Sequence, residues 1–293
     1  MCRLKLFLLI TLSILGTALS AEILITDDMG NQLRLEKPAT KIVSLAPHLT
    51  ELVYAAGAGD QLVAVVSYSD YPAEALKLPV IGSYKKINYE SLVALQPDLV
   101  LVWNSGNGPE IAERVKALGL TVYINEPQRL TDIAHSMRQI GILSGNQAQA
   151  EPAAESFQKA YQALEVNRTK PPINVFLQLW NEPAMTVNGS HIMSDVISLC
   201  GGVNIFADAL PLIPRINMES VVRRNPDVIV ATGMADERPE WLDKWAIWEE
   251  MSAVKFDDLR SIDPDFISRH TPRILVGATE LCGYLDKARA KRN

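Results

Sequence analysis

Two stretches of the chain share one pattern: residues 87–101 read INYESLVALQPDLVL, and residues 216–230 read INMESVVRRNPDVIV. Placing Glu90 on Glu219 aligns them without a gap, and seven of the fifteen positions are identical: Ile, Asn, Glu, Ser, Val, Pro and Asp. A repeat this far apart in the chain indicates two similar lobes rather than a short-period solenoid. The alternative is that two helix–strand units resemble each other by chance.

Each copy predicts a helix followed by a buried strand. An Asn can cap the helix, a Glu in its first turn suits the positive end of the helix dipole, and a Pro ends it. These residues are Asn88, Glu90 and Pro97 in the first copy and Asn217, Glu219 and Pro226 in the second. The apolar run after each Pro is typical of a strand covered on both faces. Identical capping, acidic and helix-ending residues in register favour duplication over chance.

Residues 1–21 are expected to be a secretory signal peptide. Arg3 and Lys5 precede the ten-residue apolar run LFLLITLSIL, and small residues follow it. Such a run is too short to remain as a membrane anchor. Cys2 lies before the run, whereas a bacterial lipoprotein needs its cysteine at the cleavage point. The rest of the chain is therefore predicted to be exported and soluble.

Charge and cysteine content narrow the class of protein. The formal net charge of −6 argues against nucleic acid or an anionic membrane surface as a partner. Beyond the signal peptide only Cys200 and Cys282 remain, and an even pair in an exported chain indicates one disulfide. Two buried free thiols are the alternative, and spacing alone does not decide between them.

Strands alternate with helices in both halves of the chain, which predicts an α/β fold with parallel sheets and helical crossovers. We assign an N-terminal lobe to residues 22–145, a connecting helix to 146–170 and a C-terminal lobe to 171–293. The connecting segment is one long helical pattern, and the sequence contains no Gly/Ser-rich linker. The expected architecture is two similar lobes joined by a rigid helix, with limited hinge motion and a ligand cleft between them.

Local signals give further expectations. Helices are predicted to begin at Thr50 and at Ser194, and a glycine-rich loop is predicted at residues 104–108. A further helix is expected over residues 241–251. Its tryptophans lie on one helix face, a stripe more typical of packing than of ligand contact: Trp241, Trp245 and Trp248.

Ligands of parallel α/β sheets bind at the loops that follow the carboxyl ends of the strands. In this chain such loops carry Tyr68, Trp103 and Trp180. Aromatic side chains at the strand ends of both lobes suit a large, flat ligand of mixed polarity. Alternatively, each ring covers the end of its own sheet.

Signals for catalysis or a metal are weak. The sequence has no GxSxG, Walker loop, HExxH or CxxC motif. A zinc or manganese receptor needs three or four converging ligands, and the four histidines are scattered. His48 and His270 fall on predicted loops of opposite lobes, where they could ligate a haem iron. The simpler interpretation is two solvent-facing loop histidines.

The paired glutamates suggest a partner. A solvated capping charge is the simpler interpretation of Glu90 or Glu219 alone. A pseudo-two-fold relation between the lobes would place both carboxylates on one outer surface. Two matching carboxylates suit docking onto a symmetric partner with basic sockets.

These features together resemble the helical-backbone class of periplasmic substrate-binding proteins, which serve ABC importers for cobalamin, ferric siderophores or haem. Within this class the chain is most similar to the cobalamin receptors, because of the SYSDYP sequence and the strand-end Trp103. The resemblance covers nearly all of the chain after the signal peptide. It is carried by VVSYSDYP (65–72), INYESLVALQPDLVLVW (87–103), LCGGVNIF (199–206), NMESVVRRNPD (217–227) and DFISRHTPR (265–273).

The resemblance implies roles for individual residues. Together with Trp180, the expected ligand contacts are Tyr68, Tyr84 and Trp103 in the first lobe and Asp265, Phe266, Ile267, Ser268 and Arg269 in the second. Glu90 and Glu219 match a pair that meets arginines on the permease dimer, and Cys200 and Cys282 match a disulfide. The chain departs from the family pattern where Tyr84 stands in place of a tryptophan, Ile213 in place of an aromatic residue, and Leu179-Trp180 in place of Phe-Gly.

We therefore predict a monomeric periplasmic protein that binds cobalamin or a related corrinoid and delivers it to an ABC permease dimer in the inner membrane. We expect no resident cofactor, no metal site and no catalysis. The alternative is a ferric-siderophore or haem receptor, for which only Arg215 and Arg269 are evident cationic candidates. An enzyme with Asp265 or Glu182 as base would lack a nucleophile–base pair.

Overall fold

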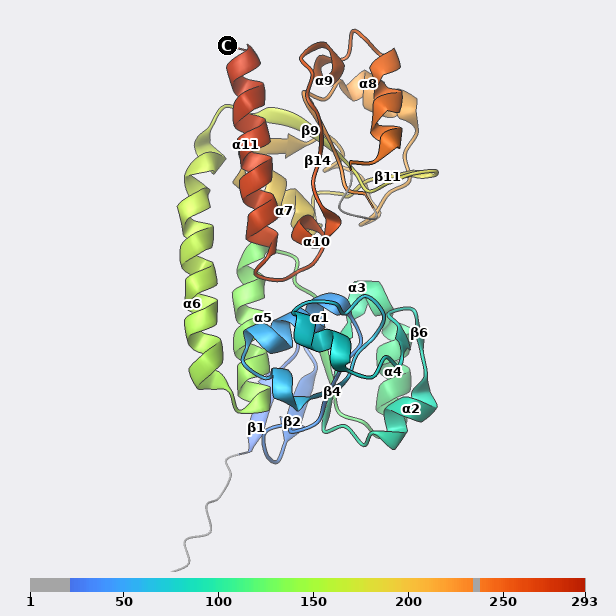
Figure 1. Ribbon diagram of the computed structural model, residues 1–293, viewed down its shortest axis with the longest axis vertical. Coiled ribbons are helices and arrows are strands. Elements are labelled where there is room, and N and C mark those ends of the chain that lie inside the picture. The colour runs from blue at the N-terminus through green and yellow to red at the C-terminus, as the bar shows by residue number, and fades with distance from the viewer. Residues whose placement is uncertain (1–21, 234–237, 293) are drawn as a thin grey trace, which may run out of the picture.

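The computed structural model describes residues 22–233 and 238–292, and it shows two α/β lobes, one above the other in Figure 1. Each lobe contains a four-stranded parallel sheet. The predicted fold class is therefore confirmed. The predicted signal peptide, residues 1–21, lies outside the described residues.

The two sheets place the repeated segments in the same position. The first has the order β4-β3-β7-β8 and the second the order β12-β9-β13-β14, so the strands of the repeat, β7 and β13, are both third. The strands of the first sheet are β3 (Ile42–Ser44), β4 (Leu62–Ala64), β7 (Leu99–Trp103) and β8 (Val122–Asn125). Those of the second are β9 (Ile173–Gln178), β12 (Gly202–Asn204), β13 (Val228–Ala231) and β14 (Leu259–Ser261).

The helices of the repeat are capped as predicted. They are α2 (Tyr89–Ala94) and α8 (Met218–Arg224). The Asn88 side chain accepts a hydrogen bond from Ser91 N at 3.1 Å, and that of Asn217 accepts one from Ser220 N at 2.8 Å. Each cap satisfies one of the amide groups that a helix start leaves without a partner.

The aspartates of the repeat also have equivalent roles. Asp98 accepts hydrogen bonds from the backbone N–H of Thr40 and Lys41, just before β3. Asp227 accepts one from Asn174 N, near the start of β9. Both carboxylates thus fix the start of the neighbouring central strand, and the duplication extends from sequence to hydrogen bonding.

Two local predictions for the N-terminal lobe need correction. Helix α1 (Pro47–Ala55) begins three residues before the predicted start at Thr50, because Pro suits the first helical position. The expected glycine-rich loop is a short helix, α3 (Asn104–Asn107), whose last side chain accepts a hydrogen bond from Trp103 N at 2.6 Å. The lobe is completed by the antiparallel pairs β1 (Ile23–Thr26) with β2 (Gln32–Leu35) and β5 (Gly82–Ser83) with β6 (Lys86–Ile87), by α4 (Pro109–Ala117), and by 3₁₀ helices at Gly59–Gln61 and Ala73–Lys77.

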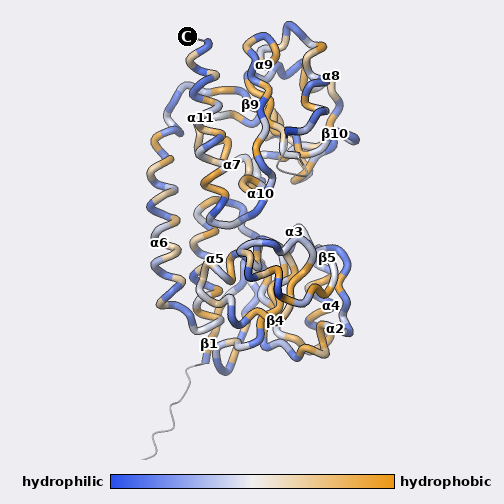
Figure 2. The backbone as a smooth tube through the Cα atoms, in the orientation of Figure 1, coloured by the Kyte–Doolittle hydropathy of each residue, from blue (hydrophilic) through white to orange (hydrophobic). Residues whose placement is uncertain are grey.

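Long helices join the lobes. Helices α5 (Leu130–Ser144) and α6 (Gln147–Leu164) run side by side, and α6 leads through a 3₁₀ turn (Glu165–Thr169) into the C-terminal lobe (Figure 1). The final helix, α11 (Ile274–Arg292), packs on α6 and α7 (Ile192–Leu199). One apolar cluster contains residues of both lobes and of these helices, among them Leu101, Ile133, Leu177 and Leu281. Figure 2 shows mostly hydrophobic segments at the centre of each lobe and a mainly hydrophilic α6.

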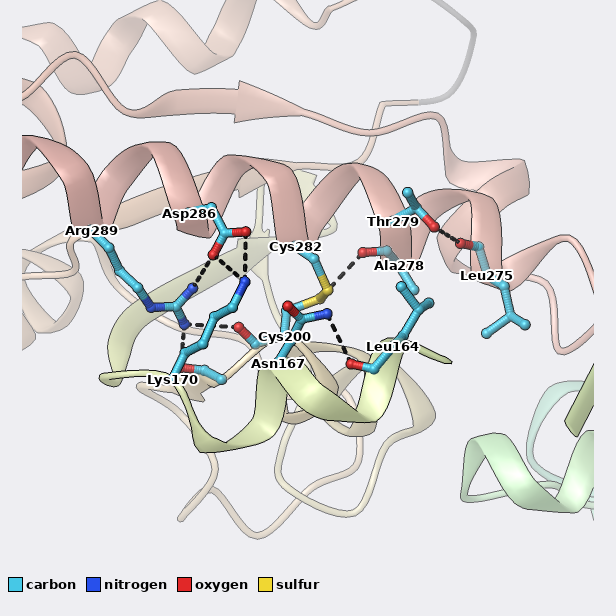
Figure 3. Close-up of a disulfide and its surroundings, with 11 residues drawn as sticks. Leu164, Asn167, Lys170, Cys200, Leu275, Ala278, Thr279, Cys282, Asp286 and Arg289 are labelled. Carbon is cyan, nitrogen blue, oxygen red and sulfur yellow. Dashed lines mark hydrogen bonds and ion pairs between the residues drawn. A yellow bond between two sulfur atoms is a disulfide. The ribbon is translucent and has the colours of Figure 1, made fainter. Parts of the chain in front are cut away.

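A disulfide fixes α11 in the C-terminal lobe. Cys200, directly after α7, is bonded to Cys282 of α11 with an S–S distance of 2.03 Å (Figure 3). This confirms the predicted bridge. Arg289 of α11 donates a hydrogen bond to Cys200 O at 2.8 Å and forms an ion pair with Asp286 on the same helix (Figure 3).

Two further predictions in the C-terminal lobe need correction. Helix α7 begins at Ile192 rather than Ser194, because the His191 side chain accepts a hydrogen bond from Met193 N and so caps it. The tryptophan-rich segment is a 3₁₀ helix, Glu240–Ile247, rather than an α-helix. Trp245 is fully buried with its ring 5.6 Å from that of Phe176, so the packing interpretation of this segment is confirmed.

The remaining short elements are β10 (Trp180–Asn181), β11 (Ala184–Met185), α9 (Ser252–Lys255) and α10 (Pro264–Ile267). Within residues 22–233 and 238–292, no helix has the length and apolar content needed to cross a bilayer.

Candidate functional site

Aromatic side chains lie at the carboxyl end of the first sheet. Tyr68 follows β4, is 74% exposed and has a φ of 68°, a left-handed conformation that is unusual for a bulky residue. Such strain is most common at functional sites. Tyr84, in the turn between β5 and β6, is partly exposed, and its ring centroid lies 6.4 Å from that of Trp103 at the end of β7. The structure thus brings Tyr84 and Trp103 together.

The second lobe contributes fewer exposed groups. Trp180 of β10 is 39% exposed, and its Nε1 donates to Glu182 O. Asp265, Phe266 and Ser268 are half-buried around α10. Ile267 differs from these residues because it is fully buried in the core. Its position supports packing rather than ligand contact.

A group of rings joins the two lobes. His48, at the start of α1, lies 5.0 Å from Trp103 and 5.1 Å from His270 between ring centroids. His270 in turn lies 6.1 Å from His191, the cap of α7. His48 and His270 are each only 4% exposed, so the expectation of two solvent-facing histidines is wrong. The segment after α10 thus contacts α1 through the ring of His270.

Burial sets the protonation of these histidines. It lowers the pKa of His48 to about 3 and that of His191 to about 4. Burial, together with the neighbouring imidazoles, lowers the pKa of His270 well below its usual range. Neither ring nitrogen of His270 has a hydrogen-bond partner among the residues that the structure describes. All three imidazoles are therefore neutral at pH 7.

Ion pairs lie beside these rings. Glu51 of α1 accepts hydrogen bonds from Arg269 at 2.9 Å and from Arg273 at 2.9 and 2.7 Å. Arg269 also contacts Asp70 at 2.7 Å and Asp265 at 2.9 Å. The sequence indicated Arg269 and Asp265 but not the partners Glu51 and Asp70, because these lie about two hundred positions away in the chain. The only local signal for Glu51 was its position as an acidic residue within the apolar pattern of α1.

A small pocket adjoins the buried rings and is lined from both lobes. The N-terminal lobe contributes Ser105 of α3 and residues 126–128 after β8. The C-terminal lobe contributes residues 190–192, Leu212 and His270. Burial raises the pKa of Glu126, although hydrogen bonds from Ser105 oppose the shift. The carboxyl ends of the two sheets therefore meet around a small pocket with both polar and apolar lining residues.

The two docking candidates are exposed. Glu90 lies in the first turn of α2 and Glu219 in the first turn of α8. Both helices lie on the side of the molecule away from α6 (Figure 1). No group of three or more His, Cys, Asp or Glu residues suited to a metal ion occurs in the described parts of the chain.

The chain is similar in sequence and in structure to periplasmic binding proteins. A family described as periplasmic binding protein matches residues 42–266. The vitamin B12-binding protein of Vibrio cholerae serotype O1 is 39% identical over 253 residues, which is 86% of this chain and 91% of that protein. The structure of the periplasmic vitamin B12 binding protein BtuF of Vibrio cholerae matches with a TM-score of 0.80 and 38% identity, covering 86% of this chain and 98% of that one.

More distant structures share the fold alone. The periplasmic haem-binding protein RhuT from Roseiflexus sp. RS-1 matches with a TM-score of 0.74 and 23% identity, covering 85% of this chain and 99% of that one. The family match spans most of the chain, and the Vibrio cholerae relative is similar over nearly its full length. The chain belongs to the periplasmic binding protein family.

Proposed function

We propose that this protein binds cobalamin or a related corrinoid between its lobes and delivers it to an ABC permease. The observation that carries the proposal is the 39% identity to a vitamin B12-binding protein over 86% of the chain. The exposed and partly buried aromatic rings at the carboxyl end of the first sheet support it, because a corrin presents a broad, largely apolar face. No covalent chemistry is required.

The proposed contacts come from both lobes. Tyr68, Tyr84 and Trp103 would pack against the corrin from the first lobe, and Trp180 with Phe266 from the second. Ser268 and Asp265 would offer polar contacts to its amide side chains. Burial raises the pKa of Asp265, against the opposing effect of the neighbouring arginines. We do not include Ile267, whose side chain is buried.

Charge disfavours an anionic siderophore as the ligand. Arg269, one of the two arginines that could meet such a chelate, already pairs with Glu51, Asp70 and Asp265. A siderophore would have to replace these carboxylates in a largely buried position. A haem ligated by His48 or His270 would require both lobes to separate, because both rings are buried.

Fluorescence titration of the purified protein tests the proposal. Cyanocobalamin should quench tryptophan fluorescence with a dissociation constant below about 1 µM. Tyr68→Ala should weaken binding, whereas Leu24→Ala, which removes an exposed side chain from β1, should leave it unchanged. Tight binding of haem or of a ferric siderophore, with no binding of cyanocobalamin, would overturn the assignment.

Delivery would use the two glutamates. Glu90 and Glu219 are exposed at equivalent places in the two lobes, which suits basic sockets on a permease dimer. A periplasmic protein acting as a monomer would present both carboxylates at once. Charge reversal of both glutamates tests this part of the proposal.

A further inference from the structure

The segment after α10 belongs to the C-terminal lobe and contacts α1 of the N-terminal lobe through its side chains. Its two arginines surround a single carboxylate, Glu51, whose side chain is only 2% exposed. Arg273 binds this carboxylate through Nε at 2.9 Å and Nη2 at 2.7 Å, and Arg269 binds it through Nη1 at 2.9 Å. Paired guanidinium–carboxylate bonds are strongly directional, so they hold only at one spacing of the lobes.

The charges in this network are compensated. Burial alone would lower the pKa of Arg269, but hydrogen bonds to Asp70 and Glu51 outweigh that effect and raise it. The same opposition, with Glu51 as the main partner, raises the pKa of Arg273. Both arginines therefore remain charged, and loss of Glu51 would leave two buried cations without their shared partner.

Two aromatic rings flank Arg273, one from each lobe. Its guanidinium lies 4.0 Å from the ring centroid of Tyr71 and 5.3 Å from that of Phe266. Tyr71 is 47% exposed and lies three residues after Tyr68. The ion pairs thus fix the position of surface aromatic groups next to the proposed ligand contacts.

The lobes have another polar contact elsewhere. Leu130 N, at the start of α5, donates to the buried carboxylate of Asp195 in α7 at 2.9 Å. Together with α6, this contact holds the lobes near α7. The Glu51 network adds an attachment at α1, so that rotation about α6 would have to break directional bonds.

We propose that Glu51, Arg269 and Arg273 form an interlobe clasp that holds the lobes at one separation and positions Tyr71 and Phe266 for the ligand. The ligand part of this inference rests on the proposed function, whereas the holding of the lobes does not. The three residues act through spacing and are positioning residues. The clasp also fixes the distance between α2 and α8, which carry the proposed docking glutamates.

Distance measurements in the unliganded protein test the clasp directly. Spin labels are placed at Val93→Cys of α2 and Ile247→Cys of the C-terminal lobe, both exposed in the native protein. Glu51→Gln should broaden the distribution of label–label distances measured by pulsed electron paramagnetic resonance and increase the mean distance. Arg273→Lys should do the same to a smaller degree, because lysine keeps the charge but cannot make the paired bonds.

Binding is measured on the same substitutions without labels. The dissociation constant for cyanocobalamin should rise about tenfold in Glu51→Gln. Asp208→Asn is the matched control, because it removes an arginine–carboxylate pair, Arg224–Asp208, that lies within one lobe. Neither distance nor affinity should change in that control. If Glu51→Gln does not fold, the same distance and affinity measurements are made on Arg273→Lys and Asp70→Asn.

The outcomes separate the two proposals. Broadened distances in a protein that does not bind cyanocobalamin would refute the ligand and support the clasp. Weaker binding with unchanged distances would show that these residues contact the ligand directly, and would overturn the clasp. Unchanged distances and unchanged affinity would also overturn it.

Discussion

The two copies of the repeat are alike where they build the fold and differ where the sheets end. Both keep the capping Asn and the Asp that fixes a central strand. In register, however, Trp103 corresponds to Thr232 and Tyr84 corresponds to Ile213. At these two positions the aromatic side chain thus occurs in the N-terminal lobe only.

This difference fits the two partners that we propose. A corrinoid has no two-fold symmetry, so the lobes that enclose it need different side chains at their carboxyl ends. A permease dimer is symmetric, so the outer helices need the same side chain, and both carry a glutamate. The fold also requires the same caps in both lobes, whatever they bind.

The largest expected effect comes from reversing the shared glutamates. Glu90→Arg combined with Glu219→Arg should abolish cobalamin uptake, because like charges would meet across the docking surface. Binding of cyanocobalamin by the purified protein should be unchanged. A double variant that reverses exposed glutamates elsewhere, Glu74→Arg with Glu250→Arg, serves as the control. Normal uptake in the first variant would refute docking through these residues.

The disulfide is a difference between the lobes that can be tested, because it lies in the C-terminal lobe. Cys200→Ala with Cys282→Ala should lower the free energy of unfolding by about 4.5 kcal/mol, the loop-entropy value for a closure of this length. The bridge spans 82 residues. Hydrogen exchange should show faster opening of β9 and α11, with little change in β3 and β7. An equal loss of protection in both lobes would show that the lobes unfold as one unit.

The buried histidines between the lobes predict a dependence on pH. Their pKa values are depressed in the folded state, to about 3 for His48 and about 4 for His191. As the pH falls below about 6.5, the unfolded state takes up protons that the folded state does not, so stability falls. Each such histidine should cost about 2 kcal/mol between pH 6.5 and 5.

Denaturation at several pH values checks this expectation. His48→Gln should reduce the slope of the unfolding free energy against pH. His135→Gln, at an exposed position on α5, should leave the slope nearly unchanged. The same slope in the wild type and in His48→Gln would contradict the assignment of a neutral, buried imidazole.

The smallest effect concerns the caps. Asn88→Ala and Asn217→Ala should each lower the free energy of unfolding by about 1 kcal/mol, because each leaves a helix amide without its acceptor. Urea denaturation should give similar losses for the two variants. A markedly larger loss of unfolding free energy for one variant would show that the two caps do not stabilise their lobes equally.

The local pattern of the sequence was sufficient for the repeat, the caps, the sheet class and the position of the aromatic groups. Each copy of the repeat, each cap and each strand end depends on residues that are close in the chain: a cap lies three residues from its partner, and a strand end lies next to its own strand. Cys200 and Cys282 could be paired because no other cysteines remained beyond the expected signal peptide.

Only the tertiary structure decided which residues meet between the lobes. His48 and His270 are loop-like by sequence yet buried, and Glu51 meets Arg273 across 222 positions. Such contacts depend on how α6 places the two sheets relative to each other. No spacing rule in the sequence links residues on opposite lobes. The sequence alone therefore determined that there are two similar lobes, and tertiary packing determined the contacts between them.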